Sequence, residues 1–404
     1  MRAVVITGLG VIGPQGVGRV PLQDALLAGR PLASPIDRSE GYHAAESSRL
    51  AALVPTLDLT RWLPPSEARR MSVPSRFAVA AARMALADAG IESLGDRRVA
   101  VVLASAFGAL LFTEKLIHQI LVDGPESAQP FYFSECVANA AAGRVAIALG
   151  ARGANVTITQ REAGPLLALA RAAQEVSEGR ADLAVAGSTD EVTPLLHAML
   201  DRFRGTARAG MGREEAARPF DASRDGVLAG EGASVVVIEA EDAAAARGAP
   251  AIARIAATAA AFDPTAGVSD WGDGAAPLAR ALERALARAG CDVTTIDRVV
   301  SGASGARRGD RVEAATLAAA WGGEPLPPVL TPKGVVGEFG GGLLASAVVA
   351  TEGAAFGRLA SFGSRDPELA VAPHDGRPLP VPRRVLVSSL AAGGAAAWAV
   401  LERP

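Results

Sequence analysis

The chain has 404 residues, 50% of them hydrophobic, and a formal net charge of −3 at pH 7. This length is ample for a large core and exceeds one ordinary domain, so we expect two fused units. The slightly acidic balance excludes a global basic surface of the kind that binds nucleic acid, and the Gly and Pro residues spread among apolar runs are typical of a globular protein.

The N-terminus enters a β-branched strand at residues 3–7 without a preceding basic segment and apolar stretch. We therefore expect no signal peptide, and no apolar run reaches the roughly 18 residues that a transmembrane helix needs. The two cysteines, Cys136 and Cys291, form no Cys-x-x-Cys pair and are expected to be reduced thiols. These patterns predict a cytoplasmic protein that binds neither membrane nor nucleic acid.

Short β-branched runs alternate with Ala- and Leu-rich segments of helical period along the whole chain. The expected strands are 3–7, 99–105, 182–187, 233–240, 297–301 and 384–389. The expected helices are 75–89, 112–122, 138–149, 163–178, 275–290 and 311–321. This alternation predicts an α/β fold with largely buried sheets.

Two segments of the chain are close echoes of each other. Each has a helix that ends in Ala-Gly, at Ala89 and at Ala289, followed by a short loop and an Asp-Arg pair that leads into a strand. Such self-similarity indicates a duplicated α/β unit. We place the junction after the strand 233–240, which predicts an N-terminal half, 1–243, and a C-terminal half, 244–404.

The segment from Arg218 to Glu239, RPFDASRDGVLAGEGASVVVIE, resembles the signature of the β-ketoacyl synthase family without a gap. The opening VVITGLGVIGPQG, the helix RFAVAAARMALADAG, the run ANAAAGRVAIALGARGANVTI and the ending VLVSSLAAGGAAAWAVLER match the same family in order. The resemblance implies a thiolase-like fold, which is a duplicated five-layer α-β-α-β-α architecture, and assembly into dimers. It implies no cofactor and no metal.

Members of this family that catalyse condensation carry an acyl chain on a cysteine at the start of a buried helix. A helix N-terminus lowers the pKa of a thiol, and two histidines donate hydrogen bonds to the enolate that forms when malonyl-carrier protein loses CO₂. Matching the chain to the family through NVTIT-x-x-x-AG-x-L places Gln160 at the nucleophile position. A carboxamide is not a nucleophile, although it can fill the site as a permanent mimic of an acyl group.

The histidine positions are also replaced. Counting back from Asp310 places Gly302 at the first one, and counting five residues on from Lys333 places Glu338 at the second. Lys333 is one of two lysines in the chain, and we expect it to pair with Glu338 or a neighbouring carboxylate. Ala392 stands where the family has a gating phenylalanine, so the resemblance predicts that no catalytic residue remains.

The resemblance also implies an acyl tunnel near the dimer interface, supplied by the segment between the strand 99–105 and the nucleophile strand. On the expected helix, Phe112, Leu116 and Ile120 recur at a spacing of four and form one stripe. The other candidate tunnel or interface residues are Phe107, Phe131, Phe133 and Cys136. The stripe is either interface core or the end of the tunnel.

Three functions are compatible with these replacements. The first is a non-catalytic chain-length factor, the β-subunit type of ketosynthase in bacterial type II polyketide synthases. It would form a heterodimer with a cysteine-bearing ketosynthase, meet acyl carrier protein mainly through that partner, and set the depth of a shared tunnel. The second is a malonyl-carrier-protein decarboxylase that supplies starter units, against which Gly302 and Glu338 count. The third is a degenerate ketosynthase recruited to another acyl-transfer role.

Overall fold

The computed structural model describes residues 2–38, 47–210 and 212–404, and most of its strands belong to one continuous sheet. The order along this sheet is β11-β10-β12-β13-β9-β1-β8-β7-β5-β6, with β2 paired to β1. The strands are β1 (Val4–Gly13), β2 (Gly16–Val17), β5 (Val99–Ala104), β6 (Asn155–Ile158), β7 (Leu183–Asp190), β8 (Gly232–Ala240), β9 (Ala253–Phe262), β10 (Arg298–Val300), β11 (Val329–Leu330), β12 (Arg384–Leu390) and β13 (Ala395–Glu402). A separate pair joins β3 (Ser34–Pro35) to β4 (Leu50–Ala51).

The sheet consists of two halves with the same strand order. The first runs β6-β5-β7-β8-β1 and the second β11-β10-β12-β13-β9. In each half three parallel strands are followed by two antiparallel ones, so the duplicated unit is confirmed. The halves meet where β1 pairs with β9. The boundary expected between residues 243 and 244 falls inside α9 (Glu241–Ala246) and stays a prediction.

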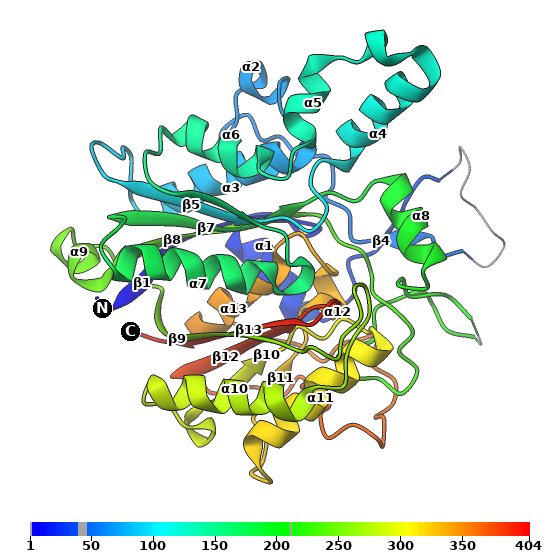
Figure 1. Cartoon of the computed structure of the whole chain (residues 1–404). Helices are drawn as coiled ribbons and strands as arrows, with labels where there is room; N and C mark the ends of the chain where they lie inside the picture. The colour runs from blue at the N-terminus through cyan, green and yellow to red at the C-terminus, as the bar shows by residue number, and fades with distance from the viewer. Residues whose placement is uncertain (1, 39–46, 211) are drawn as a thin grey trace.

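The helices complete a stack of five layers (Figure 1). Helices α3 (Val73–Asp88) and α6 (Ala140–Leu149) cover the outer face of the first half-sheet. Helices α7 (Gly164–Ser177) and α13 (Gly342–Glu352) lie between the two half-sheets. Helices α10 (Ala275–Arg288) and α11 (Arg307–Trp321) cover the outer face of the second. This arrangement confirms the thiolase-like fold.

The sequence of each helix reflects its layer. In α13 every residue from Leu343 to Thr351 is buried, because sheets cover both of its sides. Helix α10 has sheet on one side only, and it buries Leu278, Leu282 and Leu286 while its arginines and glutamate face outward. An apolar surface all round is therefore confined to the central layer, as burial requires.

Further helices and turns connect these layers. They are α1 (Arg19–Ala28), α2 (Pro65–Ala68), α8 (Pro194–Arg202), α12 (Lys333–Val336) and the short turns η3 (Arg161–Ala163) and η4 (Val293–Thr295). Between β5 and α6 the chain leaves the body as a projecting arm, residues 110–136. The arm comprises α4 (Leu110–His118), η1 (Gln119–Asp123), η2 (Pro125–Ser127) and α5 (Pro130–Cys136).

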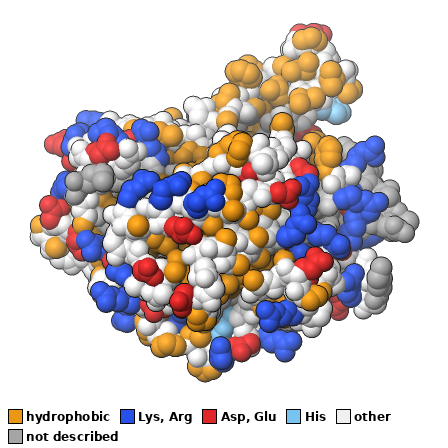
Figure 2. Space-filling view, turned by 60° about the horizontal axis from the view of Figure 1, so that its bottom comes forward, with side chains coloured by type: hydrophobic (Ala, Val, Ile, Leu, Met, Phe, Trp, Pro, Cys, Tyr) orange, Lys and Arg blue, Asp and Glu red, His pale blue; other side chains and the backbone are white. Residues whose placement is uncertain are grey.

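The arm exposes much of its apolar surface. Figure 2 shows hydrophobic side chains gathered over the part of the molecule that stands out at the top of the view. The exposed apolar residues of the arm are Ile117, Ile120, Leu121, Val122 and Phe133. A patch of this kind is typical of a surface that another protein covers.

One buried carboxylate fastens the arm to the body. Glu135 of α5 has no exposed surface and accepts hydrogen bonds from the Ser72 backbone N–H and the Ser75 hydroxyl at the start of α3. Its other oxygen accepts a hydrogen bond from Arg144 of α6 at 2.5 Å. Burial by itself would raise the pKa of Glu135, but these hydrogen bonds together hold that pKa below its usual value.

Candidate functional site

A small, narrow pocket lies at the carboxyl ends of the parallel strands β5 and β7, beside the turn η3 that leads into α7. Its charged lining residues are Arg161, Glu162, Asp190, Lys333 and Glu338. Crevices at the carboxyl ends of parallel strands are the usual ligand sites of α/β sheets. The free space amounts to about 10 Å³, which is room for about one water molecule.

Lys333 and Glu338 form a buried ion pair in this pocket. The Lys333 Nζ lies 2.5 Å from the Glu338 Oε1, and the two side chains are only 3% and 2% exposed. The Phe339 backbone N–H also donates to the Glu338 carboxylate. The expected pairing of Lys333 with Glu338 is confirmed. Lys333 begins the short helix α12 and Glu338 follows its end, so their side chains can meet across this single turn.

Gln160 lies outside the lining of this pocket, and its assignment to the nucleophile position stays a prediction. It is exposed at the end of β6, whereas Glu162, two residues later, lines the pocket. The turn η3 inserts three residues between the strand and α7, which turns Gln160 outward and Glu162 inward. Arg161 adopts a φ of 41° in this turn, an unusual value for a residue with a side chain.

Glu162 lies in an environment that disfavours its charge. Burial and, second, the nearby Glu338 carboxylate raise the pKa of Glu162 to about 7, while Lys333 and Arg161 act in the opposite direction. Its backbone carbonyl accepts a hydrogen bond from Ser389 at the end of β12, at 2.7 Å. The pocket therefore combines three carboxyl groups, including that of Asp190, with the Lys333 ammonium and the Arg161 guanidinium in very little space.

Asp190 organises the other wall of the pocket. Its Oδ1 accepts hydrogen bonds from the Ser105 hydroxyl and from the backbone N–H groups of Ala106 and Phe107. Burial, which outweighs these bonds, raises the pKa of Asp190 to about 6. These bonds fix the loop after β5, in which the Phe107 ring packs edge to face against the Phe339 ring, with 4.9 Å between the ring centroids. Phe339 itself lines the pocket.

Gly302 lies close to the same region. Glu313 accepts hydrogen bonds from the Ser301 hydroxyl and the Gly302 N–H, which fixes the loop after β10. A Cβ atom on Gly302 would lie 2.8 Å from the Ser388 carbonyl oxygen and 3.0 Å from the Ser389 hydroxyl. A side chain at position 302 would thus require β12 to move.

Ala392 lies in the turn between β12 and β13, where it is half buried. The neighbouring Gly393 donates its N–H to the Asp270 carbonyl, so this turn packs against the loop after β9. Ser389, three residues before Ala392, is the residue of this segment that contacts the pocket turn. The role of position 392 as a missing gate stays a prediction.

The candidate tunnel residues fall into two groups. Phe107 lies by the pocket, while Phe112 is buried in the arm with its ring 5.4 Å from that of Phe131 and 5.1 Å from that of Tyr132. Leu116 is half buried and Ile120 is exposed, so their stripe runs from the arm's core to its surface. Of the remaining two, Cys136 is half buried and Phe133 is 65% exposed.

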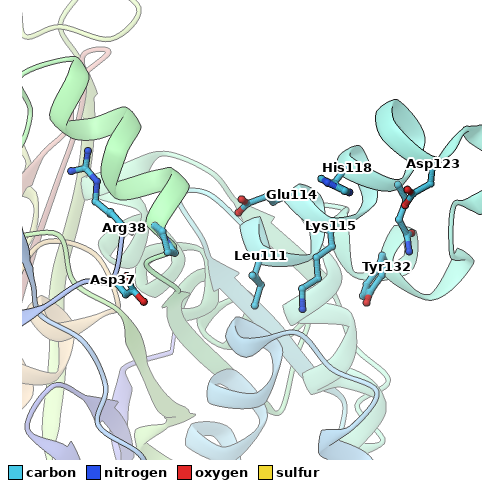
Figure 3. Close-up of a pocket in the computed structure, with 10 residues that line it drawn as sticks. Asp37, Arg38, Leu111, Glu114, Lys115, His118, Asp123 and Tyr132 are labelled. Atoms are coloured by element: carbon cyan, nitrogen blue, oxygen red, sulfur yellow. The ribbon is translucent and has the colours of Figure 1, made fainter. Parts of the chain in front are cut away.

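A groove of about 630 Å³ separates the arm from α8 and from the segment at Asp37 and Arg38 (Figure 3). Lys115, Glu114 and Tyr132 line its arm side. Acidic and basic side chains both line the groove. It is an open cleft between the arm and the body, and its shape does not indicate a particular ligand.

Sequence reasoning missed Glu162, Asp190 and Glu313 as parts of this region. For Glu162 a signal existed, since it is the only acidic residue between Asn155 and Gln174 and it stands between an apolar strand and an apolar helix. Among the described residues, no cluster of His, Cys, Asp and Glu could hold a metal ion. In the same residues, no helix is long and apolar enough to cross a membrane.

Comparison with known proteins matches both halves of the chain. Residues 1–244 match the family model "Beta-ketoacyl synthase, N-terminal domain", and residues 252–351 match "Beta-ketoacyl synthase, C-terminal domain". A "Putative polyketide beta-ketoacyl synthase 1" of Streptomyces cyaneus is 33% identical over 86% of this chain and 84% of its own length. A 3-oxoacyl-[acyl-carrier-protein] synthase 2 of Vibrio harveyi is 31% identical over 81% of this chain and 79% of its own.

Solved structures agree with these relatives. A structure titled "The ishigamide ketosynthase/chain length factor" superposes with a TM-score of 0.89 at 28% identity, covering 100% of this chain and 99% of the other. A β-ketoacyl synthase from Burkholderia phymatum gives a TM-score of 0.90 at 26% identity, with 100% of both chains covered. The repeated sheet, the five layers and these matches together show that the chain belongs to the β-ketoacyl synthase family.

Proposed function

We propose that the chain is a non-catalytic chain-length factor that works as a heterodimer with a cysteine-bearing ketosynthase of a type II polyketide synthase. The observation that carries the proposal is the pocket at the start of α7, which holds Glu162, Lys333 and Glu338 and has no thiol. The two cysteines lie elsewhere, Cys136 in the arm and Cys291 in the outer core of the second half.

The chemistry of condensation needs groups that this pocket does not offer. A thiolate must form the thioester, and neutral or cationic donors must stabilise the enolate oxygen. Here a carboxyl group stands at the start of the helix, Glu338 is tied to Lys333, and the free space fits about one water molecule. The same features count against a decarboxylase, because a malonyl carboxylate would meet two buried carboxyl groups.

The surface beside the pocket supports a partner subunit. Strand β6 ends the first half-sheet, so within the described part of the chain one side of its backbone has no neighbouring strand. On α6, next to this edge, Ile147 is 77% exposed, and Phe133 of the arm and Val137 directly after it are exposed as well. An edge strand flanked by apolar side chains is the kind of surface that large, lasting interfaces cover.

The similarity to a ketosynthase/chain length factor at 28% identity supports the same assignment. In the proposed complex the partner performs acyl transfer and condensation and meets acyl carrier protein. This subunit shapes the tunnel between them with the arm, where Phe112 and Leu116 are the leading candidates for its end. The competing possibility is an active ketosynthase, as in the relative from Vibrio harveyi.

The decisive experiment is co-expression with the proposed partner, a cysteine-bearing ketosynthase. We expect a one-to-one complex in which malonyl- and acyl-carrier protein label only the partner's cysteine, as read by intact-protein mass spectrometry. The control is the same complex with that cysteine changed to alanine, which should lose labelling and product together. An acyl adduct on the chain described here, or CO₂ release by this chain alone, would contradict the proposal.

A further inference from the structure

The narrow pocket contains polar atoms that the folded chain leaves without hydrogen bonds. Among the residues that the structure describes, the buried Oε2 of Glu162 and Oγ of Ser188 have no hydrogen-bond partner, and Lys333 has one close ionic contact, to Glu338. Ser188 is 2% exposed and Lys333 is 3% exposed, and both line the pocket with Glu162. Buried polar groups are nearly always paired, so several at one pocket point to a ligand.

The chemistry of these groups selects the ligand. An ammonium group, a hydroxyl and the backbone N–H groups at the start of a 14-residue helix can each donate a hydrogen bond to the oxygens of a carboxyl group. Glu162 brings such a group into the pocket from η3. Its side chain fills space that would otherwise be open, because only about 10 Å³ remains.

We infer that Glu162 is a built-in occupant of a carboxylate-binding pocket, in which a short free monocarboxylate such as propionate binds once the Glu162 side chain is removed. The Lys333 ammonium and the Ser188 hydroxyl would hold this ligand. The inference concerns the pocket of this chain alone, so it stands or falls independently of the partner subunit and of the proposed function.

The test removes the side chain and supplies the missing group in solution. In the full chain, in whichever assembly it purifies, Glu162→Ala should melt at a lower temperature than the wild type. Sodium propionate at about ten times its dissociation constant should then raise that melting temperature by about 2 °C. The wild type and Glu162→Gln, whose pockets are filled, should not respond beyond the effect of equal sodium chloride.

A matched cavity separates a specific site from a general void. Leu166 is fully buried in the first turn of α7, four residues after Glu162, and does not line the pocket, so Leu166→Ala opens an apolar hole nearby. Propionate should leave the melting temperature of this variant unchanged. Should Glu162→Ala not fold, Glu162→Ser makes a similar space with a small polar side chain and is expected to respond in the same way.

Adding Ser188→Ala to the responsive variant tests the hydroxyl. The double variant should bind propionate roughly threefold to tenfold more weakly, because one neutral hydrogen bond is lost. The inference is overturned if neither Glu162→Ala nor Glu162→Ser responds to propionate, or if the wild type and Leu166→Ala respond as strongly. A normal heterodimer with no propionate effect would remove this inference and leave the proposed function intact.

Discussion

The pocket and the projecting arm treat their side chains in opposite ways. The pocket buries three charged groups, Glu162, Lys333 and Glu338, and leaves almost no free volume. The arm leaves large apolar residues in water, among them Leu121 and Phe133. A family member that catalyses needs an open interior and a reactive group, whereas this chain closes its interior and presents its apolar surface outside. The contrast is what the proposed function expects of a subunit that acts at an interface.

The largest effect is expected from breaking the pocket's ion pair. Lys333→Met leaves two buried carboxyl groups without their cation and should lower the free energy of unfolding by about 3–5 kcal/mol. Chemical denaturation followed by circular dichroism measures this change. The only other lysine provides the control, since exposed Lys115→Met should change stability by less than about 0.5 kcal/mol. Equal effects of the two substitutions would show that the pocket pair does not stabilise the fold.

The arm responds to truncation of its own core. Phe112→Ala removes a ring packed against Phe131 and Tyr132 and should cost about 3 kcal/mol. If Phe112 also ends the tunnel, the co-expressed complex should make longer polyketide chains, which mass spectrometry of the products detects. Leu116→Ala is expected to act in the same direction. Unchanged product length from both folded complexes would place the end of the tunnel elsewhere.

The link between arm and body is expected to contribute less. Glu135→Gln should cost about 1–3 kcal/mol, because Ser72, Ser75 and Arg144 lose a charged acceptor. The pKa of Glu135 is lowered by folding, so its stabilisation is present above the unfolded pKa and is lost as the pH falls through the folded one. Hydrogen exchange of α4 and α5 should therefore speed up in the variant at pH 7. Protection equal to that of the wild type would mean that the arm is held by its apolar contacts alone.

The smallest effect at a single pH is expected for Glu162→Gln, which keeps the side chain and removes its titration. Folding raises the pKa of Glu162 to about 7, so the folded state binds the proton more tightly and the wild type loses stability as the pH rises from about 4.5 to 7. Other buried acids, such as Glu313, titrate in the same window, so the difference between the two proteins isolates Glu162. If the melting temperatures of the wild type and Glu162→Gln change with pH in the same way from pH 5 to pH 8, the placement of Glu162 in the pocket is contradicted.

The fold was accessible from the sequence because the duplication repeats a helix and a strand with their connecting loop. The echo at Ala89 and Ala289 corresponds to the ends of α3 and α10, which occupy the same place in the two halves. The pairing of Lys333 with Glu338 was also accessible, since a short helix brings residues five apart to one pocket. The strand β9 was missed, because six of its ten residues are alanine and only Ile255 and Thr258 are β-branched, the type that marks a strand.

The pocket residue at the start of α7 could not be fixed by counting. The turn η3 adds three residues between strand and helix, and Arg161 in that turn has a positive φ. Local backbone conformation of this kind decides which side chain points inward, and it leaves no clear trace in residue types. The same applies to the arm, where one expected helix, 112–122, is α4 up to His118 followed by a wider turn.

The meeting of β1 and β13 on either side of β9 places the two ends of the chain close together (Figure 1). Termini that are near neighbours can be joined by a short linker, and the chain can be reopened at an exposed connection. Helix α9, between the halves, exposes Glu241 and Asp242 and offers such a point. A circular permutant that begins after α9 would carry the second half before the first. If it folds, the order of the two halves along the chain is not required for folding.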